Sequence, residues 1–319
     1  MDFDLDNTPS YNKESHDSII LDKKSNKRYR SLVKIIIQSR FMRIISTLLT
    51  LSALAYGAYY INETKPELTQ QALEFVNTGT LVSLEARYTA KQIMETQTSH
   101  LLKDGSHTFG EVALRYHPYL LMEVKFTGEN MDTQEANILW SMIDGEMVLD
   151  TRSWKKTHGF ADCINCKADA YEYQILNTIS DFGGCVDAQA LRQSLNIESV
   201  LLSTWIDRCK SKKLIVQIGN DYKIHLQKPL LNVKPATQLS SVLVSKASKF
   251  SEKLAKVYTP SQIKRAASNA FGSHFAIRST RDVFVPIYSI VVVNPDGSLH
   301  TTHWNAVSGK QVHSMNFTQ

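Results

Sequence analysis

Four cysteines are the residues of this sequence whose type and spacing most directly suggest chemistry. Cys163, Cys166, Cys185 and Cys209 fall within a short part of the 319-residue chain. In an oxidising compartment such a group forms disulfides, and four cysteines allow three pairings. We expect the disulfides to form around Cys163 and Cys166, with Cys185 close enough to pair with one of them. Cys209 has the helical phase of Trp205, which indicates burial as an apolar residue.

Three other interpretations of the cysteines stay open. The first is that they are buried free thiols. The second is a zinc site built on the Cys163-x2-Cys166 pair, although the later two cysteines do not form a second C-x2-C knuckle. The third is a redox-active C-x-x-C, which would need a helix N-terminus in a thioredoxin-like βαβ unit, and no such unit is recognisable. We therefore expect disulfides first, then free thiols, zinc and redox chemistry in that order.

Two histidines near the C-terminus raise the question of a metal site. His300 and His303 lie three residues apart in a predicted strand, so their side chains should point to opposite faces and could not easily share an ion. G-x-S-x-G, H-E-x-x-H, P-loop and G-x-G-x-x-G motifs are all absent from the sequence. We therefore assign no catalytic, cofactor-binding or metal-binding residue and expect no cofactor. Whether the protein is an enzyme stays open.

The cysteines are positioned by a group of short predicted elements. Helices are expected at residues 171–181, 188–195 and 198–213, followed by a hairpin of strands at 214–217 and 222–226. Three helices and a wing-like hairpin in this order resemble a winged-helix domain over residues 168–229. That resemblance implies a compact module, which we delimit as residues 161–230, and raises the question of DNA binding.

The charges of this module argue against DNA binding. Residues 168–229 contain seven basic and seven acidic residues, so the module begins with no net attraction to phosphates. The third helix starts with Glu198, Ser199, Val200, Leu201 and Leu202, which offer no Arg, Lys, Asn or Gln to base edges. Nucleic acid is therefore not the expected partner, and contacts with proteins are favoured.

The segments on either side of the module resemble each other. Tyr88 and Gln92 match Tyr258 and Gln262, and Pro118 matches Pro286. A further match pairs Trp140 and Gly145 with Trp304 and Gly309. The order is the same in both segments, which indicates an internal repeat. We expect residues 62–160 and 231–319 to form two α+β repeats, each a helix packed on its own antiparallel sheet.

An apolar run near the N-terminus predicts a membrane anchor. Residues 44–61 carry no charge and would span about 27 Å as a helix, close to the thickness of a bilayer core. A basic cluster precedes this run, whereas residues 1–22 are acidic. The positive-inside rule then puts the disordered tail of residues 1–43 in the cytoplasm and residues 62–319 outside it. The cluster, which could also contact anionic lipid, comprises Lys23, Lys24, Lys27, Arg28, Arg30, Lys34, Arg40 and Arg43.

Together these patterns predict an α+β protein with a single N-terminal transmembrane helix and two helix-plus-antiparallel-sheet repeats that flank a winged-helix-like module. The function they favour is that of a single-pass membrane protein with an extracytoplasmic interaction or structural module, associated with other membrane or envelope proteins. One alternative is a membrane-tethered winged-helix regulator that binds DNA. A second is an envelope hydrolase or redox enzyme.

The predicted topology can be tested with reporter fusions. A reporter that works only outside the cytoplasm should be active when fused after Gln319, because the eight basic residues of the cluster retain the N-terminus inside. Activity at the same position from a cytoplasm-specific reporter alone would contradict this orientation.

Overall fold

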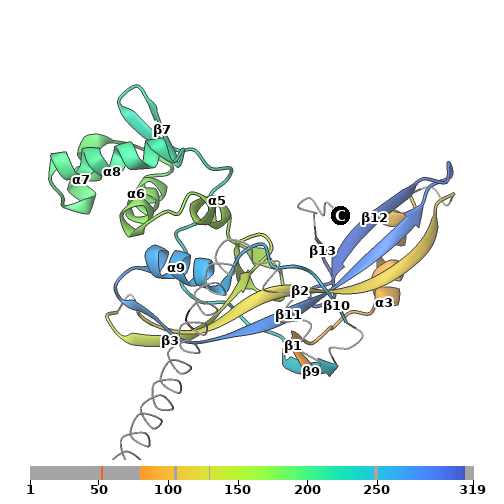
Figure 1. The fold of residues 1–319 in the computed structure, drawn as a ribbon. Coiled ribbons are helices and arrows are strands. Elements are labelled where there is room, and N and C mark those ends of the chain that lie inside the picture. Colours follow the sequence, from red (N-terminus) through yellow and green to blue (C-terminus); the bar gives the residue numbers. More distant parts are fainter. Residues whose placement is uncertain (1–51, 53–79, 104–105, 129, 248–250, 313–319) are drawn as a thin grey trace, which may run out of the picture. The chain divides into compact units, whose positions relative to one another are not determined.

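The computed structural model describes Ser52 and residues 80–103, 106–128, 130–247 and 251–312. All the elements below belong to one unit of the chain, Asn62–Gln319. Among the described residues, ten strands form one mixed sheet (Figure 1). These strands are β1 (Thr80–Leu84), β2 (Thr108–Thr127), β3 (Thr133–Ser141), β4 (Met147–Asp150), β5 (Lys155–Lys156), β9 (Leu243–Ala247), β10 (Glu252–Lys253), β11 (Phe275–Val293), β12 (Leu299–Asn305) and β13 (Gln311–Val312).

Two long antiparallel strands, β2 and β11, form the centre of this sheet (Figure 1). They have 20 and 19 residues, whereas their hairpin partners β3 and β12 have only nine and seven. Within its own repeat, each long strand therefore has a partner for only part of its length. Pairing of β2 with β11 supplies backbone hydrogen bonds along nearly the whole of both strands, which removes two long exposed edges.

The predicted fold class is wrong in its arrangement of the repeats. Residues 62–160 and 231–319 were expected to form two separate α+β units, each with its own sheet. Instead their strands join in the single order β13-β12-β11-β2-β3-β4-β5. The physical reason is the length of the central strands, because only the opposite repeat offers a partner long enough for each of them.

The pairing of β2 with β11 is symmetric, and its centre is the pair His117 and Val285, which occupy corresponding positions in the two repeats. Pro118 and Pro286 lie next to this centre, and each accepts a backbone hydrogen bond from the adjoining turn, from Met142 at 3.1 Å and from Ala306 at 3.0 Å respectively. On the outer edge of β2, Pro118 lies between the pairings with β10 and β3; on β11, Pro286 lies between those with β1 and β12. Each proline, which lacks an N–H, thus lies where its strand changes partners.

Each repeat contributes a helix that packs on strands of the other repeat. In α3 (Ala90–Thr96), Ile93 belongs to a buried cluster with Ile290, Val292 and Trp304 of the second repeat. In α9 (Pro260–Phe271), Ile263 belongs to a cluster that includes Leu120, Ile138 and Trp140 of the first repeat. Each helix therefore shares its buried cluster with strands of the other repeat, and α9 also contacts β11 of its own repeat. A short helix, α4 (Thr98–Leu101), follows α3.

The residues matched in sequence occupy matching positions in this arrangement. Thr89 with Gln92, and Thr259 with Gln262, form the same capping box at the starts of α3 and α9. Trp140 pairs with Leu120, and Trp304 pairs with Tyr288, at corresponding steps of the two hairpins. Duplication of one ancestral segment remains the prediction that explains these matches.

A reciprocal contact of a tyrosine with a glycine turn joins the two repeats. The backbone N–H of Tyr88 donates to Ala306 and that of Tyr258 donates to Met142, both at 2.9 Å. The rings of these tyrosines lie against Gly309 and Gly145, whose φ angles are +70° and +71°. A side chain at either glycine would meet both an unfavourable backbone conformation and a tyrosine ring.

Residues between the repeats form a separate three-helix group. After α5 (Phe160–Asn165) come α6 (Ala170–Asp181), β6 (Cys185–Asp187), α7 (Ala188–Leu195), α8 (Ser199–Ser211), β7 (Ile215–Ile218) and β8 (Asp221–Ile224). The strands form a sheet in the order β6-β8-β7. We call α6 to β8 the inserted module. Both ends of the insertion are tied to the first repeat, since Thr157 donates to Met147 at 2.9 Å and Thr237 donates to Asn137 at 2.7 Å.

Among the described residues, no helix is both long and apolar enough to cross a membrane. The transmembrane helix of the predicted fold class therefore has no counterpart in the part of the chain that the structure describes. Its predicted position at 44–61 lies outside the described residues, apart from Ser52, and so do the tail of residues 1–43 and its basic cluster.

The tyrosine contact predicts that Gly145→Ala is strongly destabilising. The added Cβ would lie 2.9 Å from Cε2 of Tyr258, at a φ of +71°. Gly297→Ala is the matched control, since Gly297 has a φ of +80° but no atom within 4 Å of the added Cβ. We expect Gly297→Ala to lower the free energy of unfolding by about 1–2 kcal/mol from backbone strain alone, and Gly145→Ala to lower it by roughly 2–5 kcal/mol. Urea denaturation measures both, and equal losses would contradict the contact.

Candidate functional site

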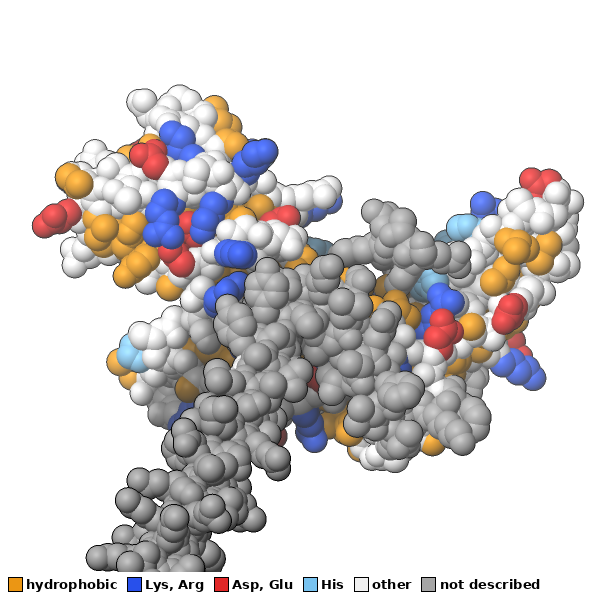
Figure 2. Space-filling view, viewed as in Figure 1, with side chains coloured by type: hydrophobic (Ala, Val, Ile, Leu, Met, Phe, Trp, Pro, Cys, Tyr) orange, Lys and Arg blue, Asp and Glu red, His pale blue; other side chains and the backbone are white. Residues whose placement is uncertain are grey.

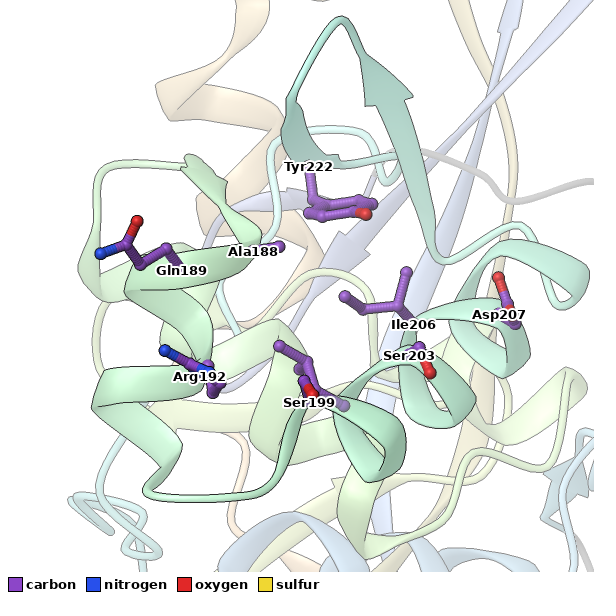
Figure 3. A pocket seen from close by; sticks show the side chains of 9 residues that line it. Ala188, Gln189, Arg192, Ser199, Ser203, Ile206, Asp207 and Tyr222 are labelled. Carbon is purple, nitrogen blue, oxygen red and sulfur yellow. The ribbon is translucent and has the colours of Figure 1, made fainter.

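A groove in the inserted module is a site that could hold another molecule. It lies between α7, α8 and β8, and its volume is about 280 Å³ (Figure 3). Leu202 and Ile206 of α8 are buried beneath it, and Tyr222 of β8 covers one side. The remaining lining is polar or small and comprises Ala188, Gln189, Arg192, Ser199, Ser203 and Asp207.

Local sequence features fix the walls of the groove. Asp187 caps the start of α7 by accepting from the backbone N–H of Ala190 at 2.8 Å. Asn196 ends α7 in the left-handed conformation, with φ +50°, which turns the chain into α8. Tyr222 lies on the central strand of the small sheet, where it pairs with both Val186 and Gln217.

Opposite charges lie at opposite sides of the groove. Figure 3 shows Arg192 on α7 at one side and Asp207 on α8 at the other, with Ile206 and Tyr222 between them. Arg192 and Asp207 are both exposed, whereas Ile206 is 4% exposed. This arrangement can hold an apolar side chain over the floor and can pair with charged groups on either side of it.

Several other charges of the module are used internally. Glu172 is 1% exposed and accepts from the ammonium of Lys212 at 2.6 Å. Arg208 pairs with Asp169 and approaches Glu172 at 3.6 Å. Figure 2 shows Lys and Arg side chains beside Asp and Glu on the visible face of the module. These pairs reduce the positive charge that the end of α8 would otherwise present to solvent.

The four cysteines are all free thiols in the structure. Cys163 and Cys209 are buried in α5 and α8, Cys166 is half-buried after α5, and Cys185 is exposed on β6. Burial raises the pKa of Cys163 and Cys166, and it raises that of Cys209 to about 12. Thiols with raised pKa values are protonated at neutral pH and are poor nucleophiles. No disulfide joins the four cysteines in the structure, and the expected disulfides stay a prediction.

Buried polar groups also line one face of the large sheet near its centre. The hydroxyl of Ser289 lies 2.9 Å from Nδ1 of His303 on the neighbouring strand. Such a pair can serve as a nucleophile and its base, but Ser289 and His303 are only 5% and 8% exposed. Within the described residues, no group of three or more His, Cys, Asp or Glu side chains could hold a metal ion. His300 is exposed on the same strand as His303.

An ion pair stabilises the turn that leads toward the insertion. Lys156 donates to Asp144 at 2.5 Å, and both side chains are largely buried. Burial alone would raise the pKa of Asp144, but the charge and hydrogen bond of Lys156 outweigh it and lower that pKa.

Nearby, Glu146 accepts hydrogen bonds from Thr157, Gly159 and Ala161 at 2.7–3.1 Å. The pKa of Glu146 is raised by its burial. These groups hold the segment from which α5 begins.

No family model matches the chain, and no curated protein or solved structure matches it significantly. Function must therefore be argued from the site itself.

Arg192, Asp207 and Tyr222 were not identified from the sequence as site residues. The spacing of Ser199, Ser203 and Asp207 at every fourth position places them on one face of a predicted helix, which is a weak signal for a surface site. Tyr222 belongs to the hairpin that follows, and its position against α8 depends on tertiary packing.

The burial of His117 predicts a specific loss of stability in acid. Burial and the nearby charges of Lys156, His303 and Arg115 lower the pKa of His117 to about 3, against an opposing effect of Asp144. The unfolded chain binds a proton at about pH 6.5, so stability is complete above that pH and is lost as the pH falls toward 3. The two pKa values set an upper limit of roughly 5 kcal/mol.

Urea denaturation across this pH range tests the prediction by comparing wild type with His117→Leu. The variant should lose this part of the pH dependence, while His300→Leu, at an exposed position, should keep it. Identical pH profiles for wild type and His117→Leu would contradict the assignment.

Proposed function

We propose that this chain is a protein-interaction module and that the groove between α7, α8 and β8 is its contact site. The observation that carries the proposal is the exposed groove itself, which has an apolar floor and opposite charges on its two sides. Exposed apolar residues also lie elsewhere on the module, since Val200 of α8 is 75% exposed and Ile218 of β7, the strand that pairs with β8, is 59% exposed. Apolar residues exposed near such a groove suit contact with a protein.

The size of the groove favours a side chain of a partner protein over a free metabolite. Small-molecule sites usually enclose about 300–1,000 Å³ and bury most of the ligand. This groove has a volume of about 280 Å³ and is open to solvent along the module surface. One large apolar side chain, inserted from a partner that also covers the surrounding surface, suits these dimensions.

The chemistry of α8 is less suited to DNA. Its first residues carry no base-reading side chain, and Arg208 and Lys212 near its end are engaged by Asp169 and Glu172. The hydroxyls of Ser203 and Thr204 donate to the carbonyl of Val200 at 2.8 and 3.0 Å. The order helix, strand, helix, helix, strand, strand supports a winged-helix resemblance, but these contacts favour a module that binds protein.

Two neighbouring arginine substitutions test the proposal. Ser203→Arg introduces a long side chain into the groove, whereas Thr204→Arg introduces the same side chain outside its lining. The two are closely matched, because each removes one side-chain hydrogen bond to Val200 at an exposed position of the same helix. We expect peptides selected from a displayed random library on the full chain to bind Ser203→Arg at least about tenfold more weakly, and Thr204→Arg with nearly unchanged affinity.

Equal effects of the two substitutions, or failure to select any peptide, would contradict the proposed site. Binding of the full chain to random-sequence duplex DNA at physiological salt should be negligible. Tight DNA binding would favour the regulator alternative instead.

A further inference from the structure

We infer that the groove recognises a peptide segment in which one apolar side chain is flanked by a carboxylate on one side and a basic group on the other. This inference rests on the proposed function and specifies the chemistry of the partner. It follows from the floor of the groove, its volume and the positions of its two charges.

The floor of the groove selects the apolar side chain. Leu202 and Ile206 are 3% and 4% exposed, so they are held in place by the module core and cannot turn away. Tyr222 lies opposite Ile206 in the groove (Figure 3). An apolar side chain in this space would lose its contact with water between these three residues, which is the main source of favourable free energy at interface anchors.

Arg192 would bind the carboxylate of the partner. Within the described part of the chain, Arg192 forms no ion pair, although it lies beside the groove and is exposed. Its guanidinium presents several N–H donors in a plane, a geometry that suits a carboxylate. A partner carboxylate next to the apolar side chain would therefore find an available cation.

Asp207 would bind the basic group. Its carboxylate lies 4.0 Å from the ammonium of Lys210, and its side chain is 75% exposed. An ion pair at this distance and exposure is weak, so it offers little competition to a basic group of the partner. Because Arg192 and Asp207 lie on opposite sides of the groove, they also fix the direction in which the segment binds.

A charge exchange tests this selectivity. Peptides are selected from a displayed random library on the wild-type full chain and on the double variant Arg192→Glu and Asp207→Lys, which has the same net charge. Wild type should enrich an apolar residue between an acidic and a basic residue in one order. The double variant should enrich the reverse order, and it should bind the wild-type peptides on the order of tenfold more weakly.

An exchange of charges on α3 is the matched control. Lys91→Glu with Glu95→Lys exchanges two exposed charges of an i,i+4 pair that is remote in sequence from the groove, and it should leave both the enriched pattern and the affinities unchanged. Salt should weaken the charge preference more than it weakens binding of the apolar residue.

The outcomes separate this inference from the proposed function. Binding that is lost in Ser203→Arg, but that shows no charge order or the same order in the double variant, would overturn the inference and leave the groove as the contact site. Binding that is insensitive to Ser203→Arg, or no binding at all, would overturn both.

Discussion

The pairing of β2 with β11 is the constraint on which the rest of the structure depends. Each of these strands is more than twice as long as its hairpin partner, so neither repeat can pair the whole of its own central strand. Once the two strands pair about His117 and Val285, α3 and α9 each share a buried cluster with strands of the opposite repeat. The turns at Gly145 and Gly309 meet Tyr258 and Tyr88 across the same pairing of the repeats. Neither repeat has a complete core without the other.

In the inserted module, ion pairs neutralise several charges internally. Glu172 is almost fully buried and takes up Lys212 and part of the charge of Arg208. Truncating Glu172 would leave Lys212 without its ion-pair partner and Arg208 with Asp169 alone, so the pairs have a structural role as well as an electrostatic one. With those charges engaged, the accessible groove is defined by Leu202, Ile206 and Tyr222. A surface of this kind gains free energy by burying apolar area rather than by neutralising phosphates.

Local sequence patterns predicted local structure well and long-range pairing poorly. The three module helices lie within one or two residues of their expected positions, because caps such as Asp187 and the apolar spacing act over a single turn. Leu81 and Leu84 have a spacing of three residues, which is typical of one face of a helix, but they lie in β1. β2 continues through Pro118, because the proline nitrogen needs no hydrogen-bond partner at that position. The exchange of the repeats could not be read from the sequence, since matched segments give the same pattern whichever strand they join. The groove was missed because Arg192, Asp207 and Tyr222 come together only in the folded module.

The matched turns at Gly145 and Gly309 show where the two repeats differ, because the first turn lies beside the insertion. Their backbones agree, since Ser141 donates to Glu146 at 3.0 Å and Asn305 donates to Lys310 at 2.9 Å. Their side chains do not. In the first turn, Asp144 binds Lys156, and the buried carboxylate of Glu146 accepts from Gly159 and Ala161 at the start of the insertion. In the second turn, the corresponding positions are Ser308 and the exposed Lys310, and the described chain ends shortly afterwards. The backbone hydrogen bond of this turn therefore occurs in both repeats. Its buried charged side chains occur only in the first turn, where they hold the start of the insertion. Because those charges lie in the turn that Tyr258 contacts, the segment that begins the insertion is held by the same packing that joins the two repeats.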